Sequence, residues 1–435
     1  MIERSITRPI LDEHIAYRLL PVLGFVCTLI LFYVFVKTRN GTAAALVCAS
    51  LLLMTPLFTV YAAEARPYSP LTACIATAMV CYQRTPAAAW IGGLFLSLLL
   101  ASSLHYYAVF VLFPFFLAEL TVVYETRKVR FWVWVALLGA LVPLGISWPL
   151  LMRTKHYFVP HFPGPVSVRT LPLMYGWYLG VAPAWGVAMV GAAFSAVLAT
   201  FFPMVSPPRD TKGSPAESVP DRVLVLGFVV LPMIGFAVAR IAHGPIVDRY
   251  FLPAILGIAA APGYVLRRAK PTGIVVAAMF VLLAIGVQEL GFWTSPRRRV
   301  VPAEQVAALA NFAEAAHHED LPIVVSGAEA YLEFWHYASP VLRRRIMALM
   351  DPADAATHTG DDTHQIAVES GSDEPVIRDL AHLAAEHSVF LLYSTGSNLD
   401  QWPERLAHDG HRLQLLAAHG SSAMYLVELK APVPN

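Results

Sequence analysis

The sequence has 435 residues, of which 57% are hydrophobic and 14% are charged, and its mean hydropathy is +0.57. A chain this apolar is typical of membrane proteins with several spans rather than of soluble globular proteins. The formal net charge is +1 and the pI is about 7.8. Because nucleic-acid-binding proteins concentrate Lys and Arg on one surface, this balance gives no reason to expect a nucleic-acid partner.

The positions of the cysteines and the absence of common catalytic motifs reduce the number of functions to consider. Cys27, Cys48, Cys74 and Cys81 all fall in apolar runs, which favours small buried side chains over a disulfide framework or a metal site. The sequence contains no GxSxG, no P-loop and no HExxH motif. We therefore expect neither a bound metal nor a cofactor.

Apolar runs that are long enough, or nearly long enough, to cross a bilayer occur about ten times. These predict a multispanning α-helical membrane protein. In chain order the runs are Leu19–Val36, Ala43–Ala63, Pro67–Tyr82, Ala88–Ser102, Tyr106–Val123, Phe131–Leu151, Pro183–Phe202, Val223–Ala239, Phe251–Val265 and Gly273–Phe292. The stretch from Thr170 to Ala182 is ambiguous, since its aromatic and glycine content also suits an interfacial or re-entrant segment.

The orientation of these spans follows from the short loops that carry Lys and Arg, because such loops stay on the cytoplasmic side. If the chain begins outside, every inner loop is basic. The inner cations are then Lys37, Arg39, Arg84, Arg127, Lys128, Arg130, Arg209, Lys212, Arg222, Arg267, Arg268 and Lys270. Arg18 before the first span and Arg297–Arg299 after the last lie outside in this arrangement, so the charge bias is incomplete.

The character of the sequence changes after Phe292, and residues 293–435 read as a soluble domain on the outer face. Short β-like runs alternate there with helix-like segments, which predicts a small α/β domain. The expected strands are Leu321–Ser326, Val389–Ser394, Leu413–Ala418 and Ala423–Leu429, and the expected helices are Ala303–His317, Glu374–His387 and Gln401–His408.

Ionisable side chains at membrane depth are costly, so their placement is informative about function. In the expected topology one group converges on the outer face, namely Glu64, Arg66, His105, Arg153, Lys155, His156, His161, Arg240, His243, Asp248 and Arg249. Arginine offers a planar fork of donors to phosphate, so this group suits an anionic headgroup. Interfacial anchoring and a local Glu64–Arg66 ion pair remain the alternative interpretations.

Several short segments, in this order, resemble the GT-C superfamily of integral-membrane glycosyltransferases. They are AYRLLPVLGF (Ala16–Phe25), KTRNG (Lys37–Gly41), YAAEARPYSP (Tyr61–Pro70), LHYYAVFVLFPFFLAEL (Leu104–Leu120) and VDRYFLPAI (Val247–Ile255). The most similar groups are the bacterial relatives of dolichyl-phosphate-mannose protein mannosyltransferases and the aminoarabinose transferases. The resemblance covers roughly residues 17–292 and implies a GT-C-like membrane domain over residues 19–292.

The resemblance also implies an activity and a site. Members of this superfamily transfer a sugar from a polyprenyl-phosphate-linked donor to a lipid, glycan or protein acceptor on the outer face of the membrane. By this analogy Arg66 and Arg249 bind the donor phosphate, Glu64 orients Arg66, and the site is shaped by Tyr68, His105 and Tyr250. The protein is then expected in a bacterial inner membrane, among its lipids, with the C-terminal domain on the periplasmic side.

One departure from the family concerns the catalytic carboxylate, which the family carries in a long first outer loop after an additional N-terminal span. Residues 1–18 match only a remnant of that loop. Asp12 and Glu13 are the carboxylates nearest to the first span on this side, so they are the candidate catalytic residues, or else the acidic start of a solvated helix. The favoured explanation is a start codon assigned too late; an inactive relative or a carboxylate borrowed from elsewhere stays open.

Two functions from other classes also stay open. A transporter for a lipid-linked sugar needs polar groups through the spans, and the predicted spans offer few charges at mid-depth. A noncatalytic membrane scaffold with a ligand-binding outer domain fits the missing N-terminal segment. Donor binding without turnover distinguishes the scaffold, and movement of a labelled lipid across vesicles identifies the transporter.

Overall fold

The computed structural model describes residues 13–161, 167–201, 218–242, 246–294, 312, 320–326, 331, 334–335, 338–349, 376–377, 380–394, 402–419 and 422–430. The chain forms two compact units. The first comprises Met1–His156 and Pro165–Gly291, and the second comprises Tyr157–Gly164 and Phe292–Asn435. Each unit has its own hydrophobic core.

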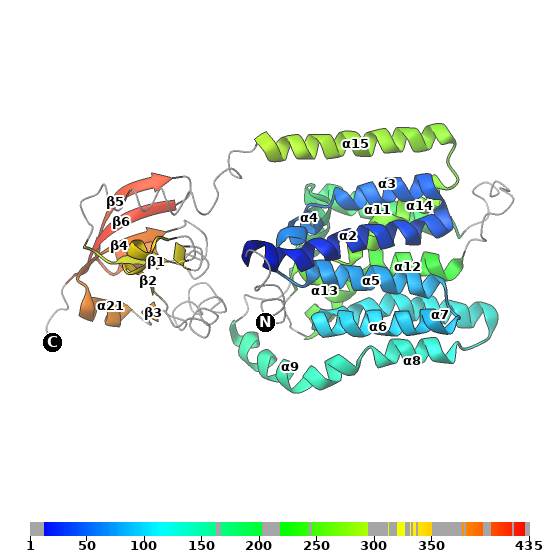
Figure 1. Cartoon of the computed structure of the whole chain (residues 1–435), viewed down its shortest axis with the longest axis horizontal. Helices are drawn as coiled ribbons and strands as arrows, with labels where there is room; N and C mark the ends of the chain where they lie inside the picture. Colours follow the sequence, from blue (N-terminus) through cyan, green and yellow to red (C-terminus); the bar gives the residue numbers. More distant parts are fainter. Residues whose placement is uncertain are drawn as a thin grey trace. The chain divides into compact units, whose positions relative to one another are not determined.

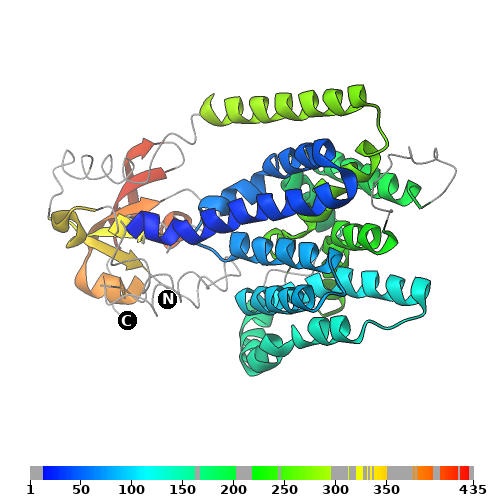
Figure 2. The same cartoon turned by 45° about the vertical axis from the view of Figure 1, so that its right-hand side comes forward.

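The first unit is a bundle of α-helices with two short 3-10 helices (Figure 1). In chain order they are α2 (Glu13–Asn40), α3 (Thr42–Leu53), α4 (Pro56–Ala63), α5 (Tyr68–Gln83), α6 (Ala88–Leu104), η1 (Tyr106–Val111), α7 (Leu112–Thr126), α8 (Phe131–Gly139), α9 (Val142–His161), α10 (Thr170–Leu179), α11 (Pro183–Ala199), α12 (Val219–Val229), α13 (Leu231–Ala242), η2 (Asp248–Phe251), α14 (Ala254–Leu266) and α15 (Pro271–Thr294). Within this unit α15 lies at the edge in both views (Figures 1 and 2).

Among the described residues, three helical segments are long and apolar enough to cross a membrane: Tyr17–Asn40, Tyr106–Thr126 and Phe131–Arg153. The number rises to six if each of three bent helix pairs is one span. Many large apolar side chains face outward from these helices, as expected where lipid replaces water as the solvent. The first unit is therefore a membrane domain, as the composition predicts.

The bent pairs correct the expectation of a continuous span over Ala43–Ala63. Helices α3 and α4 meet there at 70°, because Pro56 follows the break and has no N–H to continue the ladder of α3. Helices α10 and α11 meet at 79°, so the ambiguous stretch after Thr170 forms a helix that turns back before Pro183. Helices α12 and α13 meet at 51°.

Small residues allow the central helices to approach closely. Helix α5 packs against α2 and α6, and α12 packs against α7 and α14. A Cβ at Gly24 of α2 would lie 2.6 Å from the backbone nitrogen of Pro70 in α5, and a Cβ at Gly257 of α14 would lie 2.7 Å from the backbone of Val229 in α12. Glycine at these two crossings therefore lets α2 approach the start of α5 and lets α14 approach α12.

The second unit contains a six-stranded sheet with strand order β3-β2-β1-β4-β6-β5. Its strands are β1 (Ile323–Ser326), β2 (Ile346–Leu349), β3 (Val376–Ile377), β4 (Val389–Ser394), β5 (Arg412–His419) and β6 (Ser422–Glu428), and its described helices include α18 (Pro340–Arg343), α21 (Leu380–Glu386) and α22 (Trp402–His408). The first four strands pair in parallel, and β6 and β5 add an antiparallel edge. Strand β1 is buried on both faces, which explains its continuous apolar run.

The predicted C-terminal sheet is confirmed, with strands at all four expected places. Two strands were not expected: β2, which is short, and β3, which has two residues. Strand β3 lies inside the segment Glu374–His387, for which the sequence predicts one helix. Among the described residues of this segment, Val376–Ile377 form a strand and Leu380–Glu386 form the helix α21. The expected helix Ala303–His317 lies outside the described residues apart from Phe312.

Candidate functional site

The sequence EARPY forms the short connection between α4 and α5. Helix α4 ends where Glu64 adopts an extended backbone, and the N–H of Arg66 donates to the carbonyl of Glu64 at 2.7 Å. Pro67 is the N-cap residue of α5, and its carbonyl accepts from Leu71 N–H at 2.9 Å. The hydroxyl of Ser69 donates to the carbonyl of Tyr61 at 2.7 Å, which ties the two helix ends together.

The side chains of Glu64 and Arg66 form an ion pair and line a pocket. Arg66 Nε lies 3.3 Å from Glu64 Oε2, and the two side chains are 46% and 39% exposed. An ion pair this exposed adds only about 0–1 kcal/mol to stability, so the pair is not explained by folding alone. The pocket has a volume of about 420 Å³, and Tyr17 and Arg18 of α2 also line it.

Beside this connection lies a cluster of aromatic rings, which we call the aromatic cluster. It consists of Tyr61, Tyr68, His105, Tyr106, Tyr107 and Tyr250. The ring centroids of Tyr68 and His105 are 5.5 Å apart, and those of His105 and Tyr250 are 5.1 Å apart. The cluster therefore joins the start of α5, the end of α6 and the two 3-10 helices.

Arg249 lies against this cluster. Its guanidinium carbon is 5.6 Å from the centroid of the Tyr250 ring. The guanidinium N–H groups are within hydrogen-bonding reach of the Tyr68 hydroxyl. Its backbone N–H donates to Asp248 Oδ1 at 2.7 Å, and the hydroxyl of Tyr178 donates to the carbonyl of Asp248 at 2.7 Å. These bonds fix the turn η2, and the aromatic contacts hold the charged end of Arg249 in one place.

His105 is neutral at physiological pH. Burial, together with the nearby positive charge of Arg249, lowers the pKa of the imidazole from 6.5 to about 4. Its Nδ1 accepts a hydrogen bond from the backbone N–H of Tyr107 at 3.2 Å, so the ring proton is on Nε2. His105 is thus a fixed donor, and Arg249 supplies the positive charge of the cluster.

This arrangement suits an anion attached to an apolar or sugar-like group. A guanidinium donates up to five hydrogen bonds to phosphate oxygens, and an imidazole N–H adds another donor. The surrounding rings lower the local dielectric, which strengthens each of these interactions. Aromatic faces also offer a flat apolar surface to a ligand above the cation.

The structure brings four of the sequence-predicted site residues together. Tyr68, His105, Arg249 and Tyr250 come from three separate parts of the chain and meet in the aromatic cluster. Tyr61 also belongs to the cluster, although the sequence analysis did not select it. Its spacing of seven residues from Tyr68 across a predicted break was the only available signal.

The other predicted site residues lie elsewhere or are not described. Glu64 and Arg66 line the neighbouring pocket, and Arg66 has no described contact with Arg249. Asp12 lies outside the described residues, and so does the side chain of Glu13, whose backbone begins α2. The sequence analysis did not select Arg18 as a site residue and noted it only as a cation on the outer side of the membrane. The structure shows that Arg18 lines the same pocket as Arg66.

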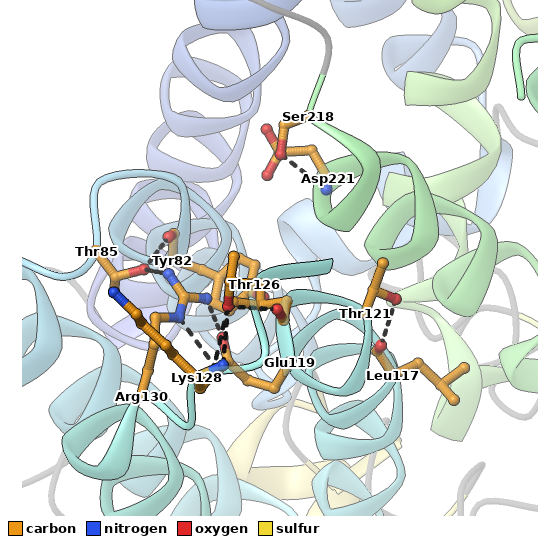
Figure 3. A network of polar contacts seen from close by, with 11 residues as sticks. Tyr82, Thr85, Leu117, Glu119, Thr121, Thr126, Lys128, Arg130, Ser218 and Asp221 are labelled. Atoms are coloured by element: carbon orange, nitrogen blue, oxygen red, sulfur yellow. Dashed lines mark hydrogen bonds and ion pairs between the residues drawn. The ribbon is translucent and has the colours of Figure 1, made fainter. Parts of the chain in front are cut away.

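A second group of charges lies at the other end of α5, about 20 Å along the helix from Tyr68. Figure 3 shows Arg130 between Glu119 of α7 and Thr85, which follows α5. Both oxygens of Glu119 accept from the Arg130 guanidinium, whose Nη1 donates to Thr85 at 2.7 Å. The Glu119 side chain is fully buried, so its carboxylate is satisfied by Arg130 inside the bundle and not by solvent.

A second ion pair lies in the same end of the bundle. Arg39, in the last turn of α2, forms an ion pair with Asp221 in the first turn of α12. The Asp221 side chain is 3% exposed. Arg222 donates to the carbonyl of Thr200 at 2.6 Å. The basic residues that the sequence analysis placed in the inner loops thus include Arg39, Arg130 and Arg222, which join helix ends to one another.

The described residues include no group of three or more His, Cys, Asp and Glu side chains that could hold a metal ion. The acidic and histidine-rich segment from Asp351 to His364 lies outside the described residues.

Comparison with known proteins gives two related structures. The crystal structure of ArnT from Cupriavidus metallidurans bound to undecaprenyl phosphate aligns with a TM-score of 0.55 and 14% identity, over 98% of this chain and 86% of the other. The structure of the same protein in the apo state aligns with a TM-score of 0.40 and 15% identity, over 98% and 85%. No protein-family model and no curated protein matches the sequence.

The similarity to the undecaprenyl-phosphate-bound structure extends over nearly the whole chain. It therefore includes both the helical unit and the C-terminal sheet. The aminoarabinose-transferase-like fold that the sequence motifs indicate is thus confirmed, because this chain shares the fold of ArnT.

Proposed function

We propose that this protein is a membrane glycosyltransferase that moves a sugar from a polyprenyl-phosphate donor to a lipid, glycan or protein acceptor. The observation that supports this most directly is the placement of Arg249. Its guanidinium lies against Tyr250 and beside Tyr68, in a membrane domain with a GT-C fold. A cation held by aromatic rings at one end of a helical membrane domain suits a phosphate whose prenyl chain enters the bilayer.

In this proposal Arg249 binds the donor phosphate and stabilises the charge that grows on it as the sugar leaves. Tyr68 and His105 donate hydrogen bonds to the phosphate or to the sugar, and Tyr250 keeps the guanidinium in position. A neutral His105 serves this role better than a charged one, because Arg249 already supplies the positive charge. Arg66, in the neighbouring pocket, contributes long-range attraction for the same anion.

The comparison supports the choice of donor. The ArnT structure of similar fold was crystallised with undecaprenyl phosphate, which is the leaving group of a polyprenyl-phosphate sugar donor. We extend that chemistry to this chain because its fold is shared and its own arginine and aromatic side chains suit the same group. The outer-face location of the site, in a bacterial inner membrane, is part of the proposal.

Transfer by the reconstituted protein tests this function. The purified protein is placed in liposomes with undecaprenyl-phosphate-linked tritiated sugars and a lipid and glycan fraction of bacterial envelopes as acceptor. We expect label to move from the donor to the acceptor, and Arg249→Gln to lower the rate by about 100-fold or more. Arg84→Gln is the matched control, since Arg84 follows the last residue of α5 and lies over the ring of Trp90.

The same experiment separates the two alternative functions. A scaffold binds undecaprenyl phosphate but transfers no sugar. A transporter moves the labelled donor across the vesicle membrane and leaves it chemically unchanged. The buried ion pairs at the other end of α5 join helix to helix, Glu119 with Arg130 and Arg39 with Asp221, and this favours transfer at one face over a path through the domain.

A further inference from the structure

We propose that the pocket formed by Tyr17, Arg18, Glu64 and Arg66 receives the acceptor, and that Glu64 is the general base that takes the proton from the acceptor hydroxyl. This inference rests on the proposed glycosyl transfer and assigns its second substrate. It gives Glu64 a role other than the orientation of Arg66 for the donor.

The first observation concerns the carboxylate oxygen itself. Glu64 Oε2 is shielded from solvent, and no hydrogen-bond donor in the described part of the chain reaches it with good geometry. Its close partner is the charge of Arg66, with Nε at 3.3 Å. A carboxylate has two oxygens with about four lone-pair sites, so Glu64 keeps acceptor sites that a substrate hydroxyl can use.

The second observation is the space in front of this carboxylate. The pocket of about 420 Å³ falls within the range of small-molecule sites, about 300–1,000 Å³. It is therefore large enough for the terminal sugar or headgroup of an acceptor. The Glu64 side chain is 39% exposed, so an acceptor that enters the pocket can reach it.

The third observation links the pocket to the donor site. Both groups flank the connection from α4 to α5, and Tyr61 lies within electrostatic range of the Glu64–Arg66 pair and of the Asp248–Arg249 pair. The Tyr61 ring is 4.6 Å from that of Tyr68, to which Arg249 bonds. The two substrates are thus expected on neighbouring surfaces of one site.

The carboxylate beside Arg249 is already committed to the fold. Asp248 Oδ1 accepts the N–H of Arg249 at 2.7 Å and shapes η2, while its carbonyl accepts from Tyr178. Of these two carboxylates, Glu64 is the one that lines the pocket described above.

The reaction then balances in one step. Glu64 accepts the hydroxyl proton of the acceptor, and the acceptor oxygen forms a bond to the anomeric carbon of the sugar. The bond between that carbon and the phosphate oxygen breaks, and the electron pair stays on the polyprenyl phosphate beside Arg249. No oxidant, reductant or metal ion enters the balance.

Glu64→Gln tests this role because it keeps the size of the side chain and removes its basicity. In the liposome assay we expect transfer to fall by about 100-fold or more, while the Kd for undecaprenyl phosphate changes by less than about twofold. The matched control is Glu125→Gln, which alters an exposed glutamate near the end of α7 and leaves transfer unchanged.

Each other outcome overturns a defined part of the proposal. Normal transfer by Glu64→Gln rules out the base. Donor affinity that falls together with transfer places Glu64 in the donor site instead, and equal losses in Glu64→Gln and Glu64→Asp indicate a structural role. Failure of the wild type to transfer sugar contradicts the proposed function and this inference together, whereas failure of Glu64→Gln alone concerns only the base.

Discussion

The ring of Tyr107 is stacked on the ring of Tyr250, with centroids 4.3 Å apart and planes inclined by 27°. This contact joins η1, which follows α6, to η2, which precedes α14. Because Arg249 precedes Tyr250 in η2, the stack determines where the guanidinium lies relative to His105. The position of the proposed phosphate ligand therefore depends on a contact between two short turns.

Replacing the stacked ring should weaken donor binding without abolishing the fold. We expect Tyr107→Ala to lower the affinity for undecaprenyl phosphate about fivefold, since an aromatic pair of this kind contributes about 0.5–1.5 kcal/mol beyond its buried area. Tyr107→Phe keeps the ring and should retain most of the affinity. Titration of both variants in nanodiscs measures this, and equal loss in the two would show that the hydroxyl, not the stack, matters.

The lowered pKa of His105 predicts a pH dependence of stability with a definite sign. The pKa is about 4 in the folded protein and 6.5 in its ordinary state, so between these values the unfolded chain binds a proton that the folded chain does not. Acidification from about pH 6.5 to about pH 4 should therefore lower the free energy of unfolding, and the contribution should level off below pH 4.

His105→Gln isolates this contribution, because glutamine does not titrate. Melting temperatures in nanodiscs between pH 4 and pH 8 should fall less on acidification for the variant than for the wild type. Carboxylates elsewhere in the protein titrate in the same pH range in both the wild type and the variant. The difference between the two curves of melting temperature against pH therefore reports His105. Parallel curves would mean that His105 titrates with its ordinary pKa.

The buried pair between Glu119 and Arg130 should be important for stability. Glu119→Gln leaves the partly buried Arg130 guanidinium without its counter-charge, and we expect a loss of about 3 kcal/mol. The double variant Glu119→Leu/Arg130→Met should recover much of this loss, since replacing both members of a buried pair by apolar side chains is often neutral. Thermal unfolding of the wild type, the single variant and the double variant measures these changes. Similar stabilities for all three proteins would mean that Glu119 and Arg130 are solvated.

The crossing of α2 and α5 makes a further prediction. Gly24→Ala places a Cβ 2.6 Å from the backbone of Pro70, which cannot move without shifting the start of α5. We expect a cost of about 1–3 kcal/mol and weaker donor binding. Gly92→Ala in α6 is the control, because a Cβ there meets nothing within 4 Å. Comparable melting temperatures for the two variants would contradict the close crossing.

The sequence predicts the membrane domain and the C-terminal sheet well because both depend on the length and spacing of apolar runs. It predicts the breaks within helices poorly. Pro56 lies inside an apolar run that is long enough for a span, and only the packing around it shows that α3 and α4 diverge. Strand β3 has two residues, too few for any periodic signal.

The site was partly predictable for a similar reason. Four candidate site residues could be selected from the sequence because each lies near the end of a predicted span, within a motif that resembles the family: Tyr68, His105, Arg249 and Tyr250. The distances between these side chains could not be predicted from the sequence. The distances depend on the 3-10 turns η1 and η2 and on the crossing of α2 and α5 at Gly24. The separation of Arg66 from Arg249 into two neighbouring groups also required the structure, because both cations had been assigned to one phosphate.

The equilibrium binding of undecaprenyl phosphate to the protein in nanodiscs tests the central claim most directly, with wild type, Arg249→Gln and Arg84→Gln measured side by side. We expect the wild type and Arg84→Gln to bind alike and Arg249→Gln to bind at least about tenfold more weakly, which corresponds to about 1.4 kcal/mol. Equal binding by all three proteins, or none by the folded wild type, would contradict the assignment of the aromatic cluster as the donor phosphate site.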